Sequence, residues 1–449
     1  MSIKKPGGFS SLIKDKLIQQ AHERKRRQFD QLDGETAAIP TPPQQDVPEQ
    51  FYRFNLHPSY QQLRIINDGA ARIGIENPFF KQHEGIAGAE TKIAGRVYVN
   101  YSSYNYLGLS GYEAVSNAAK QAIDQYGTSV SASRPVSGER PIHRELERAL
   151  ANVYQVEDVV VFVSGHATNV SVIGHLMGSK DLVLHDEFIH NSALQGMLLS
   201  GAKRMSFPHN DWHSLDKLLV ANRKQFERVL IVLEGIYSMD GDYPDLPRFV
   251  EIKKRHRVWL MVDEAHSFGV MGQNGFGIRE HFDLKNGDVD IWMGTLSKAL
   301  ASCGGYIAGE TALIEHLKFL APGFLYSVGM SPSLAAASLA ALQCLIKEPH
   351  RVRTLQARGQ YMLERLRAAA VDVGSSSGFA VIPAIVGSSI KAARLSAALF
   401  KQGINVQPIL YPAVPEKAAR LRFFVSSDHT EAQIDETVDV LAREWALLS

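Results

Sequence analysis

The stretch WLMVDEAHSFGVMG, residues 259–272, decides how this chain folds. Its first four residues are apolar, and such a run between helical patterns indicates a strand that is buried on both faces of a parallel sheet. Asp263 follows the run, at the carboxyl end of the strand, where α/β sheets bind their ligands. Because burying an unpaired carboxylate is costly, we expect Asp263 to face a cation. The alternative is a structural aspartate that caps the next turn.

Similar apolar runs recur along the middle of the chain, at VVVFV (159–163) and VLIVL (229–233), with helical periods between them. This alternation predicts an α/β domain around a buried, mostly parallel sheet. After residue 347 the pattern changes and predicts a smaller α+β lobe, joined by residues near 60 to 108. The elements expected in that lobe are a helix around Val352 to Ala370, strands near 380–386 and 420–426, and a final helix over Glu431 to Ala446.

The start of the chain differs from the rest. Residues 11–29 place Ile13, Leu17 and Ala21 four apart, which predicts a short amphipathic helix. Four prolines between residues 40 and 48 then predict a linker. The predicted organisation is a helix and proline-rich linker over 1–50, the first part of a small domain over 51–110, a large domain over 111–335 and the rest of the small domain over 336–449.

Composition narrows the class of protein. The 449 residues are 45% hydrophobic, which suits a globular protein with a substantial core. Lys and Arg number 48 and Asp and Glu 47, so the net charge of +1 creates no global field that favours nucleic acid or an anionic membrane. Two cysteines are too few for a disulfide framework, and no apolar stretch reads as a signal peptide or a membrane span. We therefore expect a soluble, cytoplasmic protein.

A lysine follows another apolar run, in VDIWMGTLSKALASCGGYIAG, residues 289–309. Lys298 leaves its strand into a crowded stretch of small residues, where burial lowers the pKa of an amine and favours the neutral form that attacks carbonyls. Thr295 and Ser297 flank it with hydroxyls that can reach a phosphate. Taken alone, the segment is also compatible with an ordinary exposed lysine.

Two further segments place polar groups after strands. In VVVFVSGHATNVSVIGHLMG, residues 159–178, Gly165 permits close backbone approach, and the amides that open the following helix can cradle a phosphate. In HDEFIHNSALQG, residues 185–196, His190 precedes a helix, where its ring can lie flat on a cofactor. Each signal is common in α/β proteins, and a polar loop histidine is the plainer interpretation of His190. The same holds for a hydrogen-bonded His266 after the strand at 259–262.

Taken together, and in their order along the chain, these segments resemble those of the α-oxoamine synthases, a branch of the pyridoxal-phosphate enzymes. The resemblance covers about three quarters of the chain and implies the aspartate aminotransferase-like fold, which is fold type I of these enzymes. The segments that carry it are YNYLGLS from Tyr104, GTSVSASRPVSGERPIHRELE, SGHATN, HNSALQG, EGIYSMDGD, VDEAHSFGVMG, GTLSKALASCGGYIAG and ARLRFFVSSDHT.

The resemblance implies a role for individual residues. Lys298 would bind pyridoxal 5'-phosphate as a Schiff base, Asp263 would pair with its pyridine nitrogen, and His266 would contact its phenolic oxygen. His190 would stack on the ring, and Ser238, in EGIYSMDGD, would lie beside it. The phosphate contacts would come from the backbone amides of Gly165 and His166 and from the hydroxyls of Thr295 and Ser297. Arg422 would hold the substrate carboxylate in a bidentate fork, with Arg420 as the fallback.

The reaction implied is a decarboxylative condensation of a small amino acid (serine, alanine or glycine) with an acyl thioester. Lys298 would act as the base at the α-carbon, and His190 and His266 would polarise the thioester carbonyl. The β-keto acid would then lose carbon dioxide to give an α-amino ketone. The YNYLG and EGIYSMDG forms look closest to serine palmitoyltransferases and to the members that accompany polyketide synthases.

The family also implies a homodimer with shared active sites. Many members carry a threonine or serine that reaches the neighbouring subunit's phosphate, where this chain has Val328 and Gly329. The N-terminal extension suggests a docking arm for an acyl carrier protein, or alternatively a solvated helix or a dimer-packing arm. Its basic residues are Lys14, Lys16, Arg24, Lys25, Arg26 and Arg27.

Two other functions compete with condensation. A plain aminotransferase shares the lysine, the aspartate and the arginine, although the pair His190 and His266 argues against it. A catalytically inactive partner subunit would lack the lysine, and Lys298 is present. The sequence does not distinguish coenzyme A from a carrier protein as the acyl donor.

Overall fold

A computed structural model of the chain describes residues 47–72, 74 and 77–448. The helix expected at 11–29 and most of the proline-rich linker lie outside these residues. The chain divides into two compact units, Met1–Ile73 and Gly74–Ser449. In the first unit, the described elements are the short 3₁₀ helices η1 (Glu49–Phe51) and η2 (Phe54–Leu56) and the helix α2 (Pro58–Arg72).

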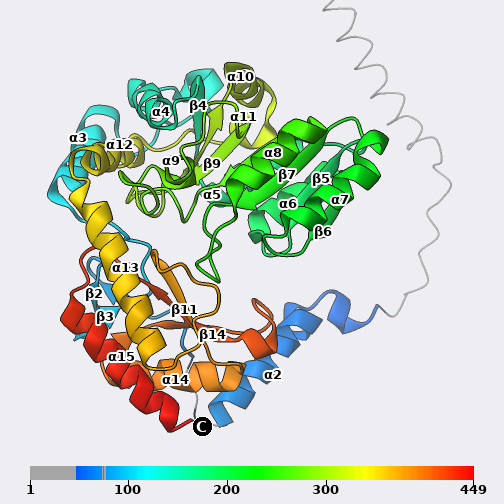
Figure 1. Ribbon diagram of the computed structural model, residues 1–449. Coiled ribbons are helices and arrows are strands. Elements are labelled where there is room, and N and C mark those ends of the chain that lie inside the picture. Colours follow the sequence, from blue (N-terminus) through cyan, green and yellow to red (C-terminus); the bar gives the residue numbers. More distant parts are fainter. Residues whose placement is uncertain (1–46, 73, 75–76, 449) are drawn as a thin grey trace, which may run out of the picture. The chain divides into compact units, whose positions relative to one another are not determined.

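A seven-stranded sheet forms the centre of the second unit (Figure 1), with the strand order β4-β10-β9-β8-β7-β5-β6. The neighbours from β9 to β6 pair in parallel, and β10 is antiparallel to both β9 and β4. The strands are β4 (Asp158–Phe162), β5 (Leu182–Asp186), β6 (Lys203–Phe207), β7 (Val229–Glu234), β8 (Trp259–Asp263), β9 (Ile291–Thr295) and β10 (Gly305–Gly309).

The run at 159–163 is therefore a strand, but the prediction of parallel pairing is wrong for it. Its neighbour β10 comes directly after β9 in the chain and returns antiparallel to it, so that β10 separates β4 from the parallel strands. The runs at 229–233 and 259–262 belong to the parallel strands β7 and β8, as expected.

Side chains from the two faces of this sheet enter two separate apolar clusters. On β7, Ile231 and Leu233 join one cluster, and Leu230 and Val232 join the other. The first cluster includes side chains from α4 (Pro141–Tyr154), α7 (Trp212–Asn222) and α8 (Leu246–His256), and the second includes side chains from α5 (Gly165–Leu176), α6 (Asn191–Ser200) and α10 (Thr311–Leu320). With helices on both faces, the edge at the strand ends is where the sheet can hold a ligand.

Two smaller sheets lie outside the large one. One has the order β11-β14-β13, and the helices α13, α14 and α15 pack with it; the other has the order β1-β2-β3-β12. Figure 1 shows α13 running beside β11 and β14. The strands are β1 (His83–Glu84), β2 (Glu90–Ile93), β3 (Arg96–Asn100), β11 (Val381–Ile385), β12 (Ile404–Asn405), β13 (Gln407–Ile409) and β14 (Arg420–Phe424), and the helices are α13 (His350–Ala368), α14 (Ser389–Lys401) and α15 (Glu431–Ala446).

The elements expected near the C-terminus are present, and the last helix has the predicted bounds. The remaining α-helices described in the second unit are α3 (Glu113–Tyr126), α9 (Gly277–His281), α11 (Pro322–Leu325) and α12 (Pro332–Lys347). The domain boundaries near residues 50, 110 and 335 stay a prediction. Among the helices of the described residues, none has the length and hydropathy needed to cross a bilayer.

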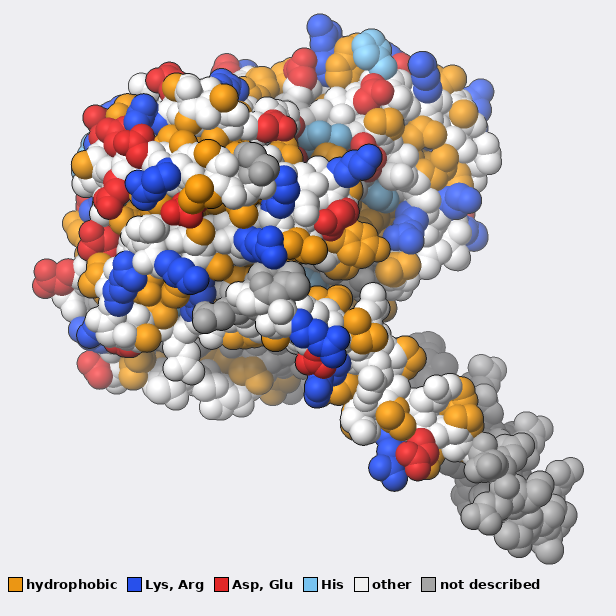
Figure 2. Space-filling view, turned by 90° about the horizontal axis from the view of Figure 1, so that it is seen from below, with side chains coloured by type: hydrophobic (Ala, Val, Ile, Leu, Met, Phe, Trp, Pro, Cys, Tyr) orange, Lys and Arg blue, Asp and Glu red, His pale blue; other side chains and the backbone are white. Residues whose placement is uncertain are grey.

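Charges of both signs are spread over the surface. On the face shown in Figure 2, Lys and Arg side chains are interspersed with Asp and Glu side chains. This mixture agrees with the net charge of +1 and leaves electrostatic recognition to local groups.

The packing between β9 and β10, next to the turn that carries Lys298, can be tested at Gly294. It lies opposite Tyr306 of β10, and a Cβ at position 294 would come within 2.1 Å of the ring carbon Cζ of Tyr306. We expect Gly294→Ala to lower the free energy of unfolding by about 1–3 kcal/mol, measured by denaturant titration. Gly69→Ala, where a Cβ meets no atom within 4 Å, is the control and should not destabilise. Equal stability of the two variants would contradict this packing.

Candidate active site

Asp263 ends β8 and is buried, with 5% of its surface exposed. One carboxylate oxygen, Oδ1, accepts a hydrogen bond from the backbone amide of Ala265 at 2.9 Å. The other, Oδ2, accepts one from the side-chain amide of Asn169 at 2.8 Å. Asp263 therefore caps the turn through Oδ1 only. Its Oδ2 contacts Asn169, and both residues line the same pocket.

Asn169 on α5 continues this contact into a chain of hydrogen bonds. Its amide nitrogen donates to Oδ2 of Asp263 and, at 2.9 Å, to Oγ of Ser192. The Ser192 hydroxyl lies 2.7 Å from Nδ1 of His190, and because Nδ1 already accepts from the backbone amide of Ser192, the hydroxyl is the donor to that nitrogen. The network thus assigns the proton of a neutral His190 to Nε2.

Both histidines are held in the neutral form. Burial lowers the pKa of His190, and although Asp263 opposes this effect, the shift remains downward. Burial also lowers the pKa of His266, far below its ordinary value, with further lowering by Lys298 and Arg422. The ring of His266 is fixed by a 2.8 Å hydrogen bond between its Nδ1 and the hydroxyl of Tyr106.

Lys298 follows β9 and lines the same pocket. Burial is the main cause that lowers the pKa of its ammonium to about 8, while the nearby carboxylates Asp263 and Glu234 act in the opposite direction. A substantial fraction of the amine is therefore neutral at mildly alkaline pH, as imine formation requires. Its ammonium nitrogen lies 5.3 Å from the ring centroid of Tyr104.

The start of α5 and the turn after β9 form another part of the pocket wall. Ser164 caps the helix through its hydroxyl, which accepts from the amide of Ala167. At Gly165, a Cβ would lie 2.9 Å from Oγ1 of Thr295, so only glycine allows this approach. The hydroxyls of Thr295 and Ser297 both donate to the carbonyl of Gly304. A helix N-terminus beside two hydroxyls is suited to a phosphate.

Arg422 on β14 brings a cation to the pocket from the smaller sheet. Its Nη1 donates to the carbonyl of Ser238 at 3.0 Å and to the sulfur of Met239 at 3.3 Å. Its Nε is buried and finds no hydrogen-bond partner in the described part of the chain, and burial lowers the pKa of the guanidinium. Arg420, by contrast, is paired with Asp240 and bonded to two backbone carbonyls, and it does not line the pocket.

The residues expected from the sequence meet in one pocket of about 310 Å³. This set is Gly165, His166, His190, Ser238, Asp263, His266, Thr295, Ser297, Lys298 and Arg422. Among the described residues, three buried polar atoms on its walls have no hydrogen-bond partner, namely Oδ1 of Asn169, Oε1 of Glu234 and Nε of Arg422. A helix N-terminus for a phosphate, a carboxylate for a protonated ring nitrogen and a lysine for a Schiff base fit pyridoxal 5'-phosphate, and Nε of Arg422 can donate to a substrate carboxylate.

Sequence reasoning missed several lining residues, among them Tyr104, Asn169, Ser192, Glu234 and Met239. Glu234 had a usable signal, because it ends the apolar run of β7 as Asp263 ends that of β8, and the two are paired in register. Burial raises the pKa of Glu234 well above its ordinary value, and the neighbouring Asp263 adds to the shift. Asn169 and Ser192 lie inside helices and gave no such signal.

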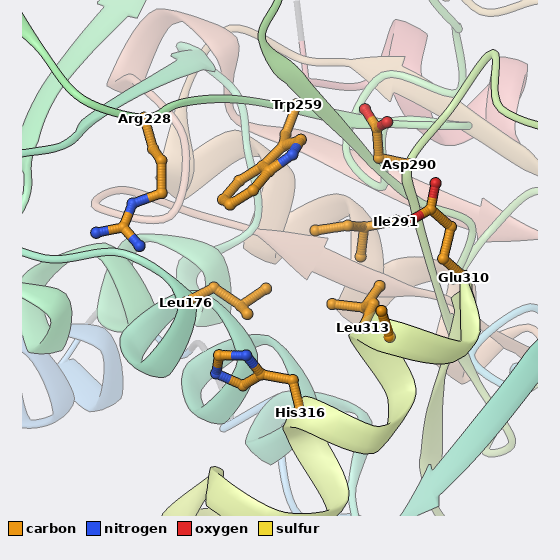
Figure 3. A pocket seen from close by; sticks show the side chains of 9 residues that line it. Leu176, Arg228, Trp259, Asp290, Ile291, Glu310, Leu313 and His316 are labelled. Atoms are coloured by element: carbon orange, nitrogen blue, oxygen red, sulfur yellow. The ribbon is translucent and has the colours of Figure 1, made fainter.

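A second pocket, of about 330 Å³, lies at the opposite ends of β8 and β9 (Figure 3). Figure 3 shows the indole of Trp259 and the side chains of Leu176, Ile291 and Leu313 around it, with Arg228 at one side. Among the described residues that line it there is no lysine and no residue of the predicted set. The chemistry therefore belongs to the pocket at the carboxyl ends.

Comparisons with known proteins agree with this site. Residues 96–441 match the family described as aminotransferase class I and II. An 8-amino-7-oxononanoate synthase of Symbiobacterium thermophilum is 39% identical over 376 residues, 84% of this chain and 95% of that protein. Another, of Treponema denticola, is 37% identical over 357 residues, 80% and 90% of the two chains. The solved serine palmitoyltransferase of S. paucimobilis with bound PLP-myriocin aldimine has a TM-score of 0.83 at 27% identity, covering 87% of this chain and 98% of its own.

The pKa of Lys298 can be tested on cofactor-free protein. We expect the rate of Schiff-base formation with added pyridoxal phosphate to rise about tenfold per pH unit and to level off near pH 8, because only the neutral amine reacts. The rate is followed by absorbance and divided by the rate constant for the neutral form of a free model amine at the same pH, which removes the titration of the cofactor without adding that of the model amine. Lys298→Ala provides the background. A plateau reached only near pH 10.5 would contradict the burial of this amine.

Proposed function

The chain belongs to the aminotransferase class I and II family and, within it, to the α-oxoamine synthases, and from this premise we propose that its pocket joins a small L-amino acid to an acyl thioester. Enzymes of this branch are pyridoxal-phosphate-dependent acyltransferases that carry out a decarboxylative condensation, and this chain is one of them. The observation that carries the proposal is that Lys298, Asp263, two neutral histidines and Arg422 line one pocket.

We assign the cofactor contacts as follows. Lys298 would hold the cofactor covalently, and the Asp263 carboxylate would accept a hydrogen bond from its ring nitrogen. The amides at the start of α5, together with the hydroxyls of Thr295 and Ser297, would hold its phosphate. His190, His266 and Ser238 would contact its ring. When bound, pyridoxal phosphate supplies an electron sink for the electron pairs left at the α-carbon by a proton and by carbon dioxide.

Lys298 moves the proton at the α-carbon. With the amino acid bound, its free amine would remain in the same low-dielectric pocket, where a pKa of about 8 suits it to take up and return a proton near neutral pH. Asp263 lies close enough to raise that pKa, so its carboxylate would stabilise the ammonium form that results from proton abstraction.

Arg422 holds the carboxylate of the amino acid. Its guanidinium donates to a neutral carbonyl and a sulfur, both weaker acceptors than a carboxylate, and its Nε has no hydrogen-bond partner among the residues that the structure describes. A substrate carboxylate satisfies these donors and fixes which bonds of the α-carbon face Lys298. After condensation, the same carboxylate is the group that leaves as carbon dioxide.

The two histidines serve the acyl group. In the tautomer set by Ser192, His190 presents an N–H at Nε2, which can donate to the thioester carbonyl as negative charge develops on its oxygen. His266, anchored through Nδ1 by Tyr106, presents its Nε2. A transaminating enzyme has no need for such donors to a second carbonyl, which favours condensation over the aminotransferase alternative.

A homodimer is the assembly we propose, with active sites at the subunit interface. Support comes from large exposed apolar side chains on α6, on α10 and after α11, since exposed apolar surface marks interfaces. Helices α6 and α11 pack on α5, and α10 packs on α11. The exposed side chains are Leu198 and Leu199 on α6, Phe319 and Leu320 on α10, and Tyr326 and Val328 beyond α11. At Val328 the side chain has no hydroxyl to offer a neighbouring phosphate, so any such contact in this protein uses another group.

The cytoplasm is the compartment we propose.

Replacing the lysine tests the core of the proposal. Lys298→Ala should lower turnover by at least about a thousandfold, because the same side chain holds the cofactor and moves the proton. Turnover is measured as labelled carbon dioxide released from a carboxyl-labelled amino acid in the presence of an acyl thioester. Lys347→Ala, at an exposed position on α12, is the control, and circular dichroism monitors the fold. Normal release by Lys298→Ala would refute the assignment.

Residues 1–46 lie outside the described part of the chain, and we propose that their basic residues dock an acyl carrier protein, whose surface is typically acidic. Deletion of residues 1 to 45 should then reduce turnover with a carrier-bound acyl group and leave turnover with acyl-coenzyme A unchanged. The loss should shrink as salt rises, since exposed charges are screened. Equal rates of the full-length and truncated chains on both donors would refute docking and leave the condensation itself untouched.

A further inference from the structure

His209 lies between two carboxylates beside the pocket, in the loop that follows β6. Its Nδ1 is 2.9 Å from Oδ1 of Asp186, at the end of β5, and its Nε2 is 2.9 Å from Oδ2 of Asp242, in the loop that follows β7. Asp186 is fully buried and Asp242 is nearly so. An ionised carboxylate only accepts hydrogen bonds, so both ring nitrogens donate, and only the imidazolium form has two N–H groups.

The loop that His209 reaches through Asp242 is the one that carries Ser238 and Met239. The loop closes on itself, since the amide of Tyr237 donates to the carbonyl of Asp242 at 2.9 Å and the amide of Gly241 donates to the carbonyl of Tyr237 at 2.8 Å. Gly241 has a positive φ of 72°, and a Cβ there would lie 2.0 Å from the carbonyl oxygen of Val381. The loop is therefore held as one compact unit between the two sheets.

On its other side, the same loop holds the arginines of β14. The carbonyl of Ser238 and the sulfur of Met239 accept from Arg422, and the carbonyl of Met239 and the carboxylate of Asp240 accept from Arg420. A shift of the loop therefore displaces two acceptors that orient the Arg422 guanidinium.

We propose that His209 is a positioning residue for recognition of the substrate carboxylate: as an imidazolium clamped between Asp186 and Asp242, it fixes the loop over residues 236–242, and the loop fixes Arg422. This inference rests on the proposed role of Arg422 as the carboxylate anchor. It adds a residue that lies outside the pocket and touches neither cofactor nor substrate.

The groups around His209 support the charged form. Asp186 faces it from β5 and Asp242 from the loop after β7, the carboxylate of Glu187 accepts from its backbone amide, and the ring of Tyr237 meets it edge-on at 4.5 Å. Although burial lowers the pKa of His209, the two aspartates outweigh it and raise the pKa to about 10. Because this folded-state pKa lies above the ordinary value of 6.5, the clamp is fully present below about pH 6.5 and is lost as pH rises through about 10.

The test compares His209→Gln with His213→Gln in the full-length holoenzyme. The first change replaces the imidazolium with a neutral amide that can still form hydrogen bonds, so it removes the charge of the clamp. His213 is exposed on α7, four residues away, and serves as the matched control. We expect His209→Gln to raise KM for the amino acid at least about tenfold, with kcat within about threefold and KM for the acyl thioester unchanged. His213→Gln should alter none of the three.

A pH series separates positioning from a general loss of structure. The ratio of the amino-acid KM of His209→Gln to that of the wild type should fall toward one as pH approaches about 10, since the wild type then loses its own clamp. The titration of the substrate amine cancels in this ratio. A ratio that stays constant with pH, or a rise in both KM values, would overturn the inference.

Asp242→Asn keeps the proposal testable if His209→Gln does not fold. This variant retains the shape of the side chain and removes the charge, and it should raise the amino-acid KM in the same selective way. If Asp242→Asn leaves that KM within about twofold of the wild type, the inference fails. Arg422→Lys distinguishes the two levels: if it raises the amino-acid KM while His209→Gln does not, only the positioning role is wrong, and if it does not, the assignment of Arg422 itself is wrong.

Discussion

A buried carboxylate at the end of a central strand is the constraint on which this site depends. Asp263 is buried, and within the described part of the chain its carboxylate accepts hydrogen bonds from two neutral donors, the backbone amide of Ala265 and the side-chain amide of Asn169. Those bonds orient the carboxylate and leave its charge to be balanced by a cation in the pocket. A protonated ring nitrogen would meet that need, so binding of the cofactor would depend directly on the electrostatics of this sheet edge.

The same low-dielectric surroundings set the other groups. Burial lowers the pKa of Lys298, His190 and His266 and raises that of Glu234. Each shift disfavours a charge, so the pocket keeps a nucleophilic amine and two neutral imidazoles without a separate device for each. A chain of hydrogen bonds from Asp263 through Asn169 and Ser192 links that carboxylate to His190.

Much of this arrangement was predictable because it is local in sequence. Apolar runs marked the strands, and Asp263 follows such a run directly, while Lys298 comes in the turn after one. The antiparallel pairing of β4 was not predictable, because it depends on the later strand β10 lying between β4 and β9. Nor was His209, since its two carboxylates come from segments 23 and 33 residues away and meet only in the folded protein. Glu234 was predictable from the same pattern as Asp263, because it ends the apolar run of β7.

We infer that Asp263 keeps a proton on the ring nitrogen of the cofactor, and nitrogen NMR can observe that proton. In protein loaded with ¹⁵N-labelled pyridoxal phosphate, the ring-nitrogen shift should stay at the protonated value from about pH 6 to about pH 9, because the buried carboxylate stabilises the cation. In Asp263→Asn it should move to the unprotonated value. A wild-type shift that titrates as in the free cofactor, or one that Asp263→Asn leaves unchanged, would contradict the account.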